Sequence, residues 1–161
     1  MRAATPAIAV LVQAGVRHRT HRYDHDPARG SYGREAAEAM GVDPERVFKT
    51  LVATVGGRLV VAVVPVAATL DLKSLAAALG AKRADMADPG EAERSSGYVL
   101  GAISPLGQKR RLTTVVDDSV QQWDTMFCSG GHRGLEIELA PADLVRLTGA
   151  RVAPIARRDG P

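Results

Sequence analysis

The sequence predicts an α+β fold in which helices and strands are mixed, without the regular alternation of a βαβ repeat. Two apolar, β-branched runs at 48–55 and 59–64 are separated by Gly56-Gly57, which is a strong hairpin signal. Several short helical patterns begin at a capping residue and end at a glycine. With 161 residues, 45% of them apolar and 24% charged, we expect residues 1–161 to form a single globular domain.

The first half of the chain opens with a helix signal. Thr5-Pro6 places a capping residue before a proline at the first helical position, and the apolar run that follows ends at Gly15. A short polar strand at 18–23, a second helix at 31–40 and a short helical turn from Asp43 are expected before the hairpin.

The second half alternates short helices and strands. Asp71 and Asp88-Pro89 each begin a helix, the first of which ends at Gly80. Strands are expected at 112–116, 126–129 and 135–139, followed by a helix at 141–147 and a final edge strand at 152–156.

Charge and targeting signals are weak. The formal net charge of +3 is a mild preference for polyanions, and the basic run Lys109-Arg110-Arg111 is by itself more often solvated surface. No apolar stretch approaches membrane-spanning length, and the single cysteine excludes an intrachain disulfide. We expect a cytoplasmic protein that does not contact a membrane.

Lys49 lies inside an apolar strand pattern. Alternation puts it on one face with Val47 and Leu51. If that face is covered, the ammonium must find a partner or lose its proton, which marks a candidate site residue. The alternative, an outward-facing lysine on a half-exposed strand, agrees equally well with the pattern.

Two glycine-rich stretches, 97–107 and 129–134, could bring backbone N–H groups close to an anion or an oxyanion. Neither matches a phosphate-binding P-loop, and their spacing alone favours tight loops between strands. The histidines at 18, 21, 25 and 132 match no metal-binding motif, so no metal or cofactor is expected. Cys128 lies in an apolar run and is interpreted as structural.

A resemblance extends this interpretation. The segments that carry it keep their order and spacing over nearly the whole chain: 5–7, 23–27, 47–51, 62–66, 70–73, 78–82, 86–89, 94–98, 101–111, 129–139 and 155–159. In these segments the chain resembles the YbaK/EbsC family of Cys-tRNA(Pro) deacylases, which is related to the editing domain of bacterial prolyl-tRNA synthetases.

The resemblance implies a mixed, largely antiparallel sheet curled toward a barrel, with helices packed around it and a small pocket at its mouth. It implies that Lys49 is the key catalytic residue, and we assign oxyanion stabilisation to backbone N–H groups near Gly101. The substrate-binding residues that it implies are Tyr23, Tyr32, Thr50, Ser129 and Glu136. Position 32 is Tyr where the family leads us to expect Phe, and position 136 is Glu where we expect Asp, so pocket volume and reach differ.

The implied function is removal of cysteine from proline tRNA, by attack of the substrate thiol on its own ester. A water-dependent deacylase of Ala-tRNA(Pro) is the alternative within this class. A non-catalytic module that binds tRNA or a synthetase is the alternative from another class. The expected partners are aminoacylated proline tRNA, with phosphate contacts from Lys109, Arg110 and Arg111, and prolyl-tRNA synthetase.

Overall fold

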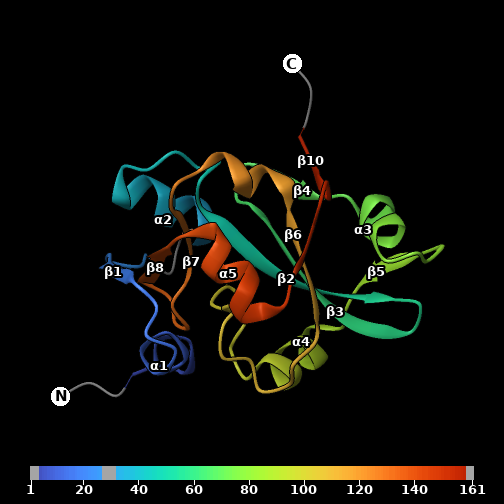
Figure 1. Ribbon diagram of the computed structural model, residues 1–161, viewed down its shortest axis with the longest axis horizontal. Helices are drawn as coiled ribbons and strands as arrows, with labels where there is room; N and C mark the ends of the chain where they lie inside the picture. The colour runs from blue at the N-terminus through green and yellow to red at the C-terminus, as the bar shows by residue number, and fades with distance from the viewer. Residues whose placement is uncertain (1–3, 27–31, 159–161) are drawn as a thin grey trace.

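The computed structural model describes residues 4–26 and 32–158 (Figure 1). Within these residues it confirms the mixed α+β class. In chain order the elements are α1 (Pro6–Gln13), β1 (His18–Arg22), α2 (Tyr32–Met40), β2 (Phe48–Val55), β3 (Arg58–Pro65), β4 (Thr69–Leu70), α3 (Leu72–Ala78), β5 (Ala84–Met86), α4 (Pro89–Ser96), β6 (Thr113–Asp117), a 3-10 helix η1 (Asp118–Gln122), β7 (Met126–Ser129), β8 (Leu135–Leu139), α5 (Pro141–Thr148), β9 (Arg151–Ala153) and β10 (Ala156–Arg157).

A five-stranded sheet forms the centre of the molecule, with the strand order β5-β2-β3-β6-β9. The expected hairpin is present, because β2 pairs with β3 along its whole length. β5 pairs with β2 only at Ala53, Thr54 and Val55. The first half of β2 therefore has an edge that β5 does not cover.

Two smaller sheets complete the β structure. β1, β8 and β7 form an antiparallel sheet, and β10 pairs with β4. A bridge between Val47 and Phe127 connects the start of β2 to β7. Among the described residues the only parallel strand pairs are β3–β6 and β6–β9, so pairing is mixed and largely antiparallel. The strands described here form no closed barrel, and the expected curl toward one is not confirmed.

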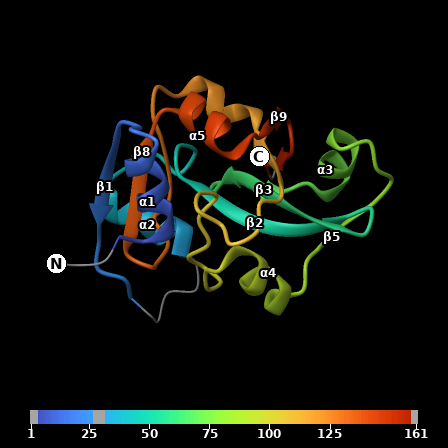
Figure 2. The ribbon, with the colours of Figure 1, turned by 60° about the horizontal axis from the view of Figure 1, so that its bottom comes forward.

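The core lies on both faces of β3. Val61 and Val63 pack with α1, α5 and the three-stranded sheet. Val60, Ala62 and Val64 point the other way and pack with α3. Figure 2 shows α5 above the β2–β3 hairpin and α4 below it. No helix in the described part of the chain is long and apolar enough to cross a membrane.

Local signals explain why the helices begin and end where they do. The Thr5 hydroxyl accepts a hydrogen bond from the Ile8 N–H at 3.2 Å, which satisfies one free donor at the start of α1. Asp71 and Asp88 cap α3 and α4 in the same way. Gly149 ends α5 in the left-handed region, with φ of 64°, where glycine is favoured.

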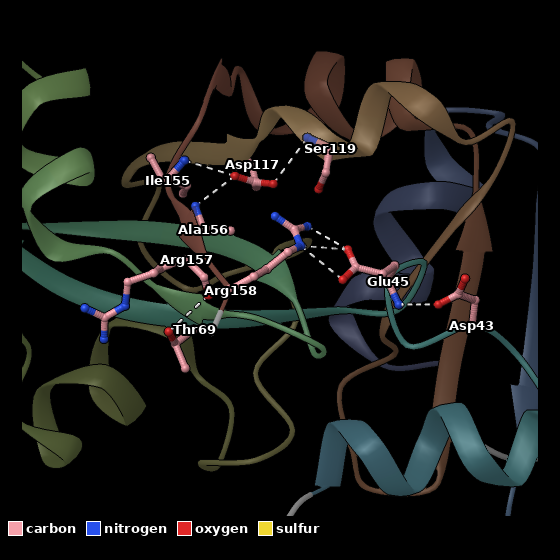
Figure 3. A network of polar contacts seen from close by, with 9 residues as sticks. All are labelled: Asp43, Glu45, Thr69, Asp117, Ser119, Ile155, Ala156, Arg157 and Arg158. Atoms are coloured by element: carbon pink, nitrogen blue, oxygen red, sulfur yellow. Dashed lines mark hydrogen bonds and ion pairs between the residues drawn. The ribbon is translucent and has the colours of Figure 1, made fainter. Parts of the chain in front are cut away.

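The expected final strand at 152–156 is wrong in one respect: it is two strands, β9 and β10, separated at Pro154. Proline has no N–H for a sheet hydrogen bond. The N–H groups of Ile155 and Ala156 instead donate to Asp117 Oδ1, each at 2.9 Å, while Asp117 Oδ2 accepts from the Ser119 N–H at 3.2 Å (Figure 3). β10 can then leave the central sheet and pair with β4.

A second contact, made by the residue directly after β10, also holds the C-terminal strand. Arg158 contacts both carboxylate oxygens of Glu45, with the shortest distance from Nη2 to Oε1 at 2.6 Å (Figure 3). This pair is partly exposed, so it contributes less than the buried Asp117 contacts.

Replacing Asp117 tests this anchor. Asp117→Ala leaves three backbone N–H groups without their acceptor, and we expect a loss of about 2–4 kcal/mol in the free energy of unfolding. Asp117→Asn keeps one oxygen that can accept and should lose clearly less. Urea denaturation of the three proteins measures this, and equal stability of the Ala variant and the wild type would contradict the assignment.

Candidate functional site

A cavity of about 430 Å³ lies at the uncovered half of β2. Its walls come from β2, α4, the start of β8 and the two glycine-rich stretches. Six of the residues that the resemblance implicates line it together: Tyr23, Lys49, Thr50, Gly101, Ser129 and Glu136. The side chain of Tyr32 lies outside the described part of the structure. Lys109, Arg110 and Arg111 are exposed and lie outside this cavity.

Lys49 is partly buried in the wall of the cavity. Burial lowers the pKa of its ammonium, and the positive charge of Arg34 lowers it further. Within residues 4–26 and 32–158 the Lys49 side chain makes no hydrogen bond or ion pair. Burial removes part of the hydration of this ammonium, and no carboxylate of the described residues replaces the lost water. Such a cation is suited to an anionic or strongly polar ligand.

Thr50 offers polar groups on the same strand. Its hydroxyl is buried and has no hydrogen-bond partner in the described structure. The carbonyl of Val52 accepts from the Ala87 N–H at 3.1 Å, on the side of β2 away from β3. Because peptide groups alternate sides along a strand, the Thr50 N–H and C=O face that side too, before β5 begins.

The two glycine-rich stretches are tied together by Ser129. Its hydroxyl donates to the Ala102 carbonyl at 2.9 Å and accepts from the Gly131 N–H at 3.1 Å. Arg133 adds a second tie by donating to the Leu100 carbonyl at 3.0 Å. The Ser129 hydroxyl is therefore occupied by backbone contacts, and within the described residues no histidine forms the hydrogen bond to it that would activate a serine nucleophile.

Gly101 carries an N–H that makes no hydrogen bond to the described residues. Its neighbours differ: the Leu100 N–H donates to Glu93 Oε2 at 2.9 Å, and the Ala102 N–H donates to the Val99 carbonyl at 3.0 Å. Gly101 has φ of 83°, a conformation that favours glycine. The loop thus leaves the Gly101 donor available at the cavity.

Glu136 is a buried carboxyl at the cavity. Burial raises its pKa to about 8, so the group is mainly protonated at neutral pH. It makes no side-chain hydrogen bond to the described residues. Burial also raises the pKa of Tyr23, and the nearby Glu136 raises it further.

Cys128 lies outside the cavity. It lies on β7 and is completely buried in the core, and burial raises the pKa of its thiol. Its interpretation as a structural residue agrees with this position.

Sequence reasoning missed much of the cavity wall. Apolar residues from the segment before α4, from α4 itself and from the 97–107 loop contribute, together with two polar residues: Met86, Ala87, Pro89, Ala92, Leu100, Ile103, His132 and Arg133. His132 and Arg133 directly follow Gly130-Gly131, which was a usable signal. The apolar residues carried none, because an apolar side chain in a loop looks the same whether it lines a cavity or fills the core.

The other histidines are engaged elsewhere. His21 contacts Glu138 at 2.9 Å, His25 contacts Glu35 at 2.7 Å, and His18 contacts the Val16 carbonyl at 2.8 Å. Among the described residues, no three His, Cys, Asp or Glu side chains are grouped so as to hold a metal ion.

Known proteins resemble this chain in sequence and in fold. The family model for the aminoacyl-tRNA editing domain matches residues 25–147. A protein of Enterococcus faecalis, named Putative Cys-tRNA(Pro)/Cys-tRNA(Cys) deacylase EbsC, is 41% identical over 125 residues, which cover 76% of each chain. Proline–tRNA ligase of Geobacillus kaustophilus is 27% identical over 100 residues, which cover 62% of this chain and 18% of the ligase. A crystal structure described as a putative trans-editing enzyme for prolyl tRNA synthetase has a TM-score of 0.81 and 23% identity, and the match covers 97% of this chain and 99% of that one.

The raised pKa of Glu136 predicts a pH-dependent stability. An acid that holds its proton more tightly in the folded state than in the unfolded one lowers the free energy of unfolding as pH rises. The window runs from the ordinary value of 4.5 to about 8, with a slope of at most about 1.4 kcal/mol per pH unit. Glu136→Gln should remove this slope, whereas Asp124→Asn, at an exposed position, should keep it. Urea denaturation of the three proteins from pH 5 to 9 measures it, and parallel curves for wild type and Glu136→Gln would refute it.

Proposed function

Because the chain belongs to the aminoacyl-tRNA editing domain family, we propose that it is a trans-editing deacylase that removes cysteine wrongly attached to proline tRNA. The observation that carries the proposal is Lys49, an ammonium in the wall of a small cavity that has no acidic partner in residues 4–26 and 32–158. Such a group suits the oxygen-rich 3′ end of an aminoacylated tRNA. The name of the EbsC relative agrees with this substrate class.

The cysteine of the substrate supplies the nucleophile in this proposal. Its thiolate attacks its own ester carbonyl, a C–S bond forms, and the bond from the carbonyl carbon to the ribose oxygen breaks. The thiol proton passes to the departing ribose oxygen, which releases tRNA and a cyclic thiolactone. Because the ring closes within one bound molecule, proximity does much of the work, and the protein has to fold the aminoacyl group and stabilise the oxyanion. The occupied Ser129 hydroxyl and the buried Cys128 thiol support a substrate nucleophile over a protein one.

The cavity residues take distinct roles. Lys49 holds the terminal ribose or phosphate oxygens, or the ester carbonyl. The N–H of Gly101 stabilises the oxyanion that forms as the thiolate attacks. Thr50 offers to the substrate the backbone N–H and C=O that face the open side of β2. The residues that shape the space for the aminoacyl group are Tyr23, Tyr32, Ser129 and Glu136.

Glu136 favours a second candidate, a water-dependent deacylase of alanine on proline tRNA. A carboxyl in the cavity with a pKa of about 8 can take a proton from an attacking water in its ionised fraction. This reaction would depend on Glu136, whereas thiol attack would not need a base at that position. A non-catalytic module that binds tRNA or a synthetase would show binding without turnover.

The partners follow from the proposed substrate. We propose that aminoacylated proline tRNA binds, and that prolyl-tRNA synthetase contributes tRNA selectivity. The similarity to part of a proline–tRNA ligase supports this link. We place the reaction in the cytoplasm and treat residues 1–161 as one editing domain.

A deacylation panel separates the candidate functions. We expect rapid release of cysteine from proline tRNA, and release of serine slower by at least about tenfold because a neutral hydroxyl is a poor nucleophile. Mass spectrometry should detect the thiolactone or its opened product. Alanine release that disappears in Glu136→Gln would favour the water-dependent candidate. If the protein binds tRNA but turns over none of the esters, an enzymatic function is excluded and the non-catalytic binding module is favoured.

Lys49 variants test the key residue. Lys49→Ala should lower single-turnover deacylation by on the order of 100-fold or more, with the thermal midpoint unchanged or raised because a desolvated cation is removed. Lys49→Arg should also be impaired, since a planar guanidinium needs a different space from a compact ammonium. Lys73→Ala is the matched control on an exposed lysine. Near-normal turnover by folded Lys49→Ala would return Lys49 to the role of an ordinary strand lysine.

A further inference from the structure

A second hollow, of about 740 Å³, lies on the other side of α4 from the cavity. Four arginines from three separate segments line it, and we call it the arginine groove: Arg58 at the start of β3, Arg94 on α4, and Arg110 and Arg111 before β6. Glu91 is the one acidic residue in its lining. Four positive charges and one negative charge leave +3, which equals the formal net charge of the whole chain. Positive charge is therefore concentrated here.

The four arginines are exposed, and the Asp88 carboxylate and the Arg94 guanidinium both lie close to Gly90 at the start of α4. Within the described residues none of them makes an ion pair or a side-chain hydrogen bond. Other arginines differ: Arg46, Arg146 and Arg158 each contact an acid at 3.2 Å or less. Arg111 is at the margin of the groove, because its Nη2 lies 3.0 Å from the position that a Cβ would take at Gly149, the end of α5. Positive charges that outnumber the one acidic residue in a shared hollow repel one another, and an anion in the hollow relieves that repulsion.

The groove is held in shape by backbone contacts. The N–H of Arg110 donates to the Ser95 carbonyl, and the N–H of Lys109 donates to the Ser96 carbonyl, each at 2.9 Å. The segment that carries Arg110 is thereby fixed to the end of α4, which carries Arg94. Planar guanidinium groups on such a fixed frame are suited to phosphate oxygens.

α4 connects the groove to the cavity. Pro89 and Ala92 line the cavity, whereas Glu91, Arg94 and Ser95 line the groove. The two sites are thus separated by about the width of a helix, ~10 Å. A stacked nucleic-acid strand covers that distance in roughly three nucleotides, so a single-stranded end that enters the cavity can place its next phosphates at the groove.

We propose that the arginine groove binds backbone phosphates of the tRNA acceptor end while the terminal aminoacyl group occupies the cavity. This inference rests on the proposed function. It retains Arg110 and Arg111 of the basic run and adds Arg58 and Arg94. Lys109 does not line the groove, and its side chain is not part of the site.

The test compares two charge-matched double variants. Arg58→Gln/Arg94→Gln removes two positive charges from the groove, and Arg17→Gln/Arg157→Gln removes two exposed charges elsewhere. β10, which carries Arg157, and α4 lie at opposite ends of the view in Figure 1. Thermal melting first establishes that both proteins fold.

Binding of proline tRNA that carries no amino acid is then measured from 50 to 300 mM salt. The groove variant should bind on the order of tenfold more weakly. The slope of log affinity against log salt should fall by about 0.7–0.9 for each phosphate that the variant no longer neutralises. The control variant should bind like the wild type. Equal affinity and slope for the two double variants would overturn the proposal.

A short substrate separates this proposal from the proposed function. A cysteinyl ester of adenosine fills the cavity without reaching the groove, so the groove variant should release its cysteine at the wild-type rate. Slow turnover of this ester by the folded groove variant would overturn the groove proposal. Loss of prolyl-tRNA synthetase binding with unchanged tRNA binding would also overturn it, in favour of a protein-docking surface. If wild-type protein turns over neither ester, the proposed function fails, while the salt dependence of tRNA binding still decides the groove.

Discussion

The short pairing between β5 and β2 is the constraint on which the candidate site depends. β3 covers one edge of β2 completely, but β5 covers only the last three residues of the other edge. The first half of β2 is therefore open to a cavity, and residues from both of its faces reach that cavity at the edge. This is how Lys49 and Thr50, which point to opposite faces of a strand, can line one space. A longer β5 would close the space by pairing with the peptide groups of Thr50.

The opposite wall depends on hydrogen bonds that hold two loops in place. The Tyr98 hydroxyl donates to the Leu106 carbonyl at 2.6 Å, within the first loop. The Thr5 hydroxyl donates to the Gly130 carbonyl at 2.6 Å, so the cap of α1 also fixes the second loop. A Cβ at Gly107 would lie 2.5 Å from the backbone of α1, which only glycine avoids. These contacts hold the loop on both sides of Gly101, whose N–H has no partner among the described residues, and oxyanion stabilisation requires a donor held in position.

Much of the fold was predictable because its signals are local. Gly56-Gly57 between two β-branched runs specified the hairpin, and capping residues with following glycines marked the ends of the helices. The errors fall where distant contacts decide. β4 and β5, of two and three residues, are too short for a periodic pattern, and they exist because β10 and β2 lie beside them. The final strand is divided because Asp117, about 38 residues earlier, accepts the N–H groups that a continuous strand would have used.

For the site, the sequence by itself determined the α+β class, the family resemblance and six of the residues that line the cavity. It left the position of Lys49 undecided between buried and exposed, because strand alternation does not say what covers a face. Only the tertiary structure decided that Lys49 has no acidic partner among the described residues and that Glu136 is buried enough to hold a proton near neutral pH. It also brought Arg58 and Arg94 beside Arg110, although they are far apart in the chain. Burial and pairing are relations between distant segments, so a local pattern can name the charged groups but cannot state their electrostatic environment.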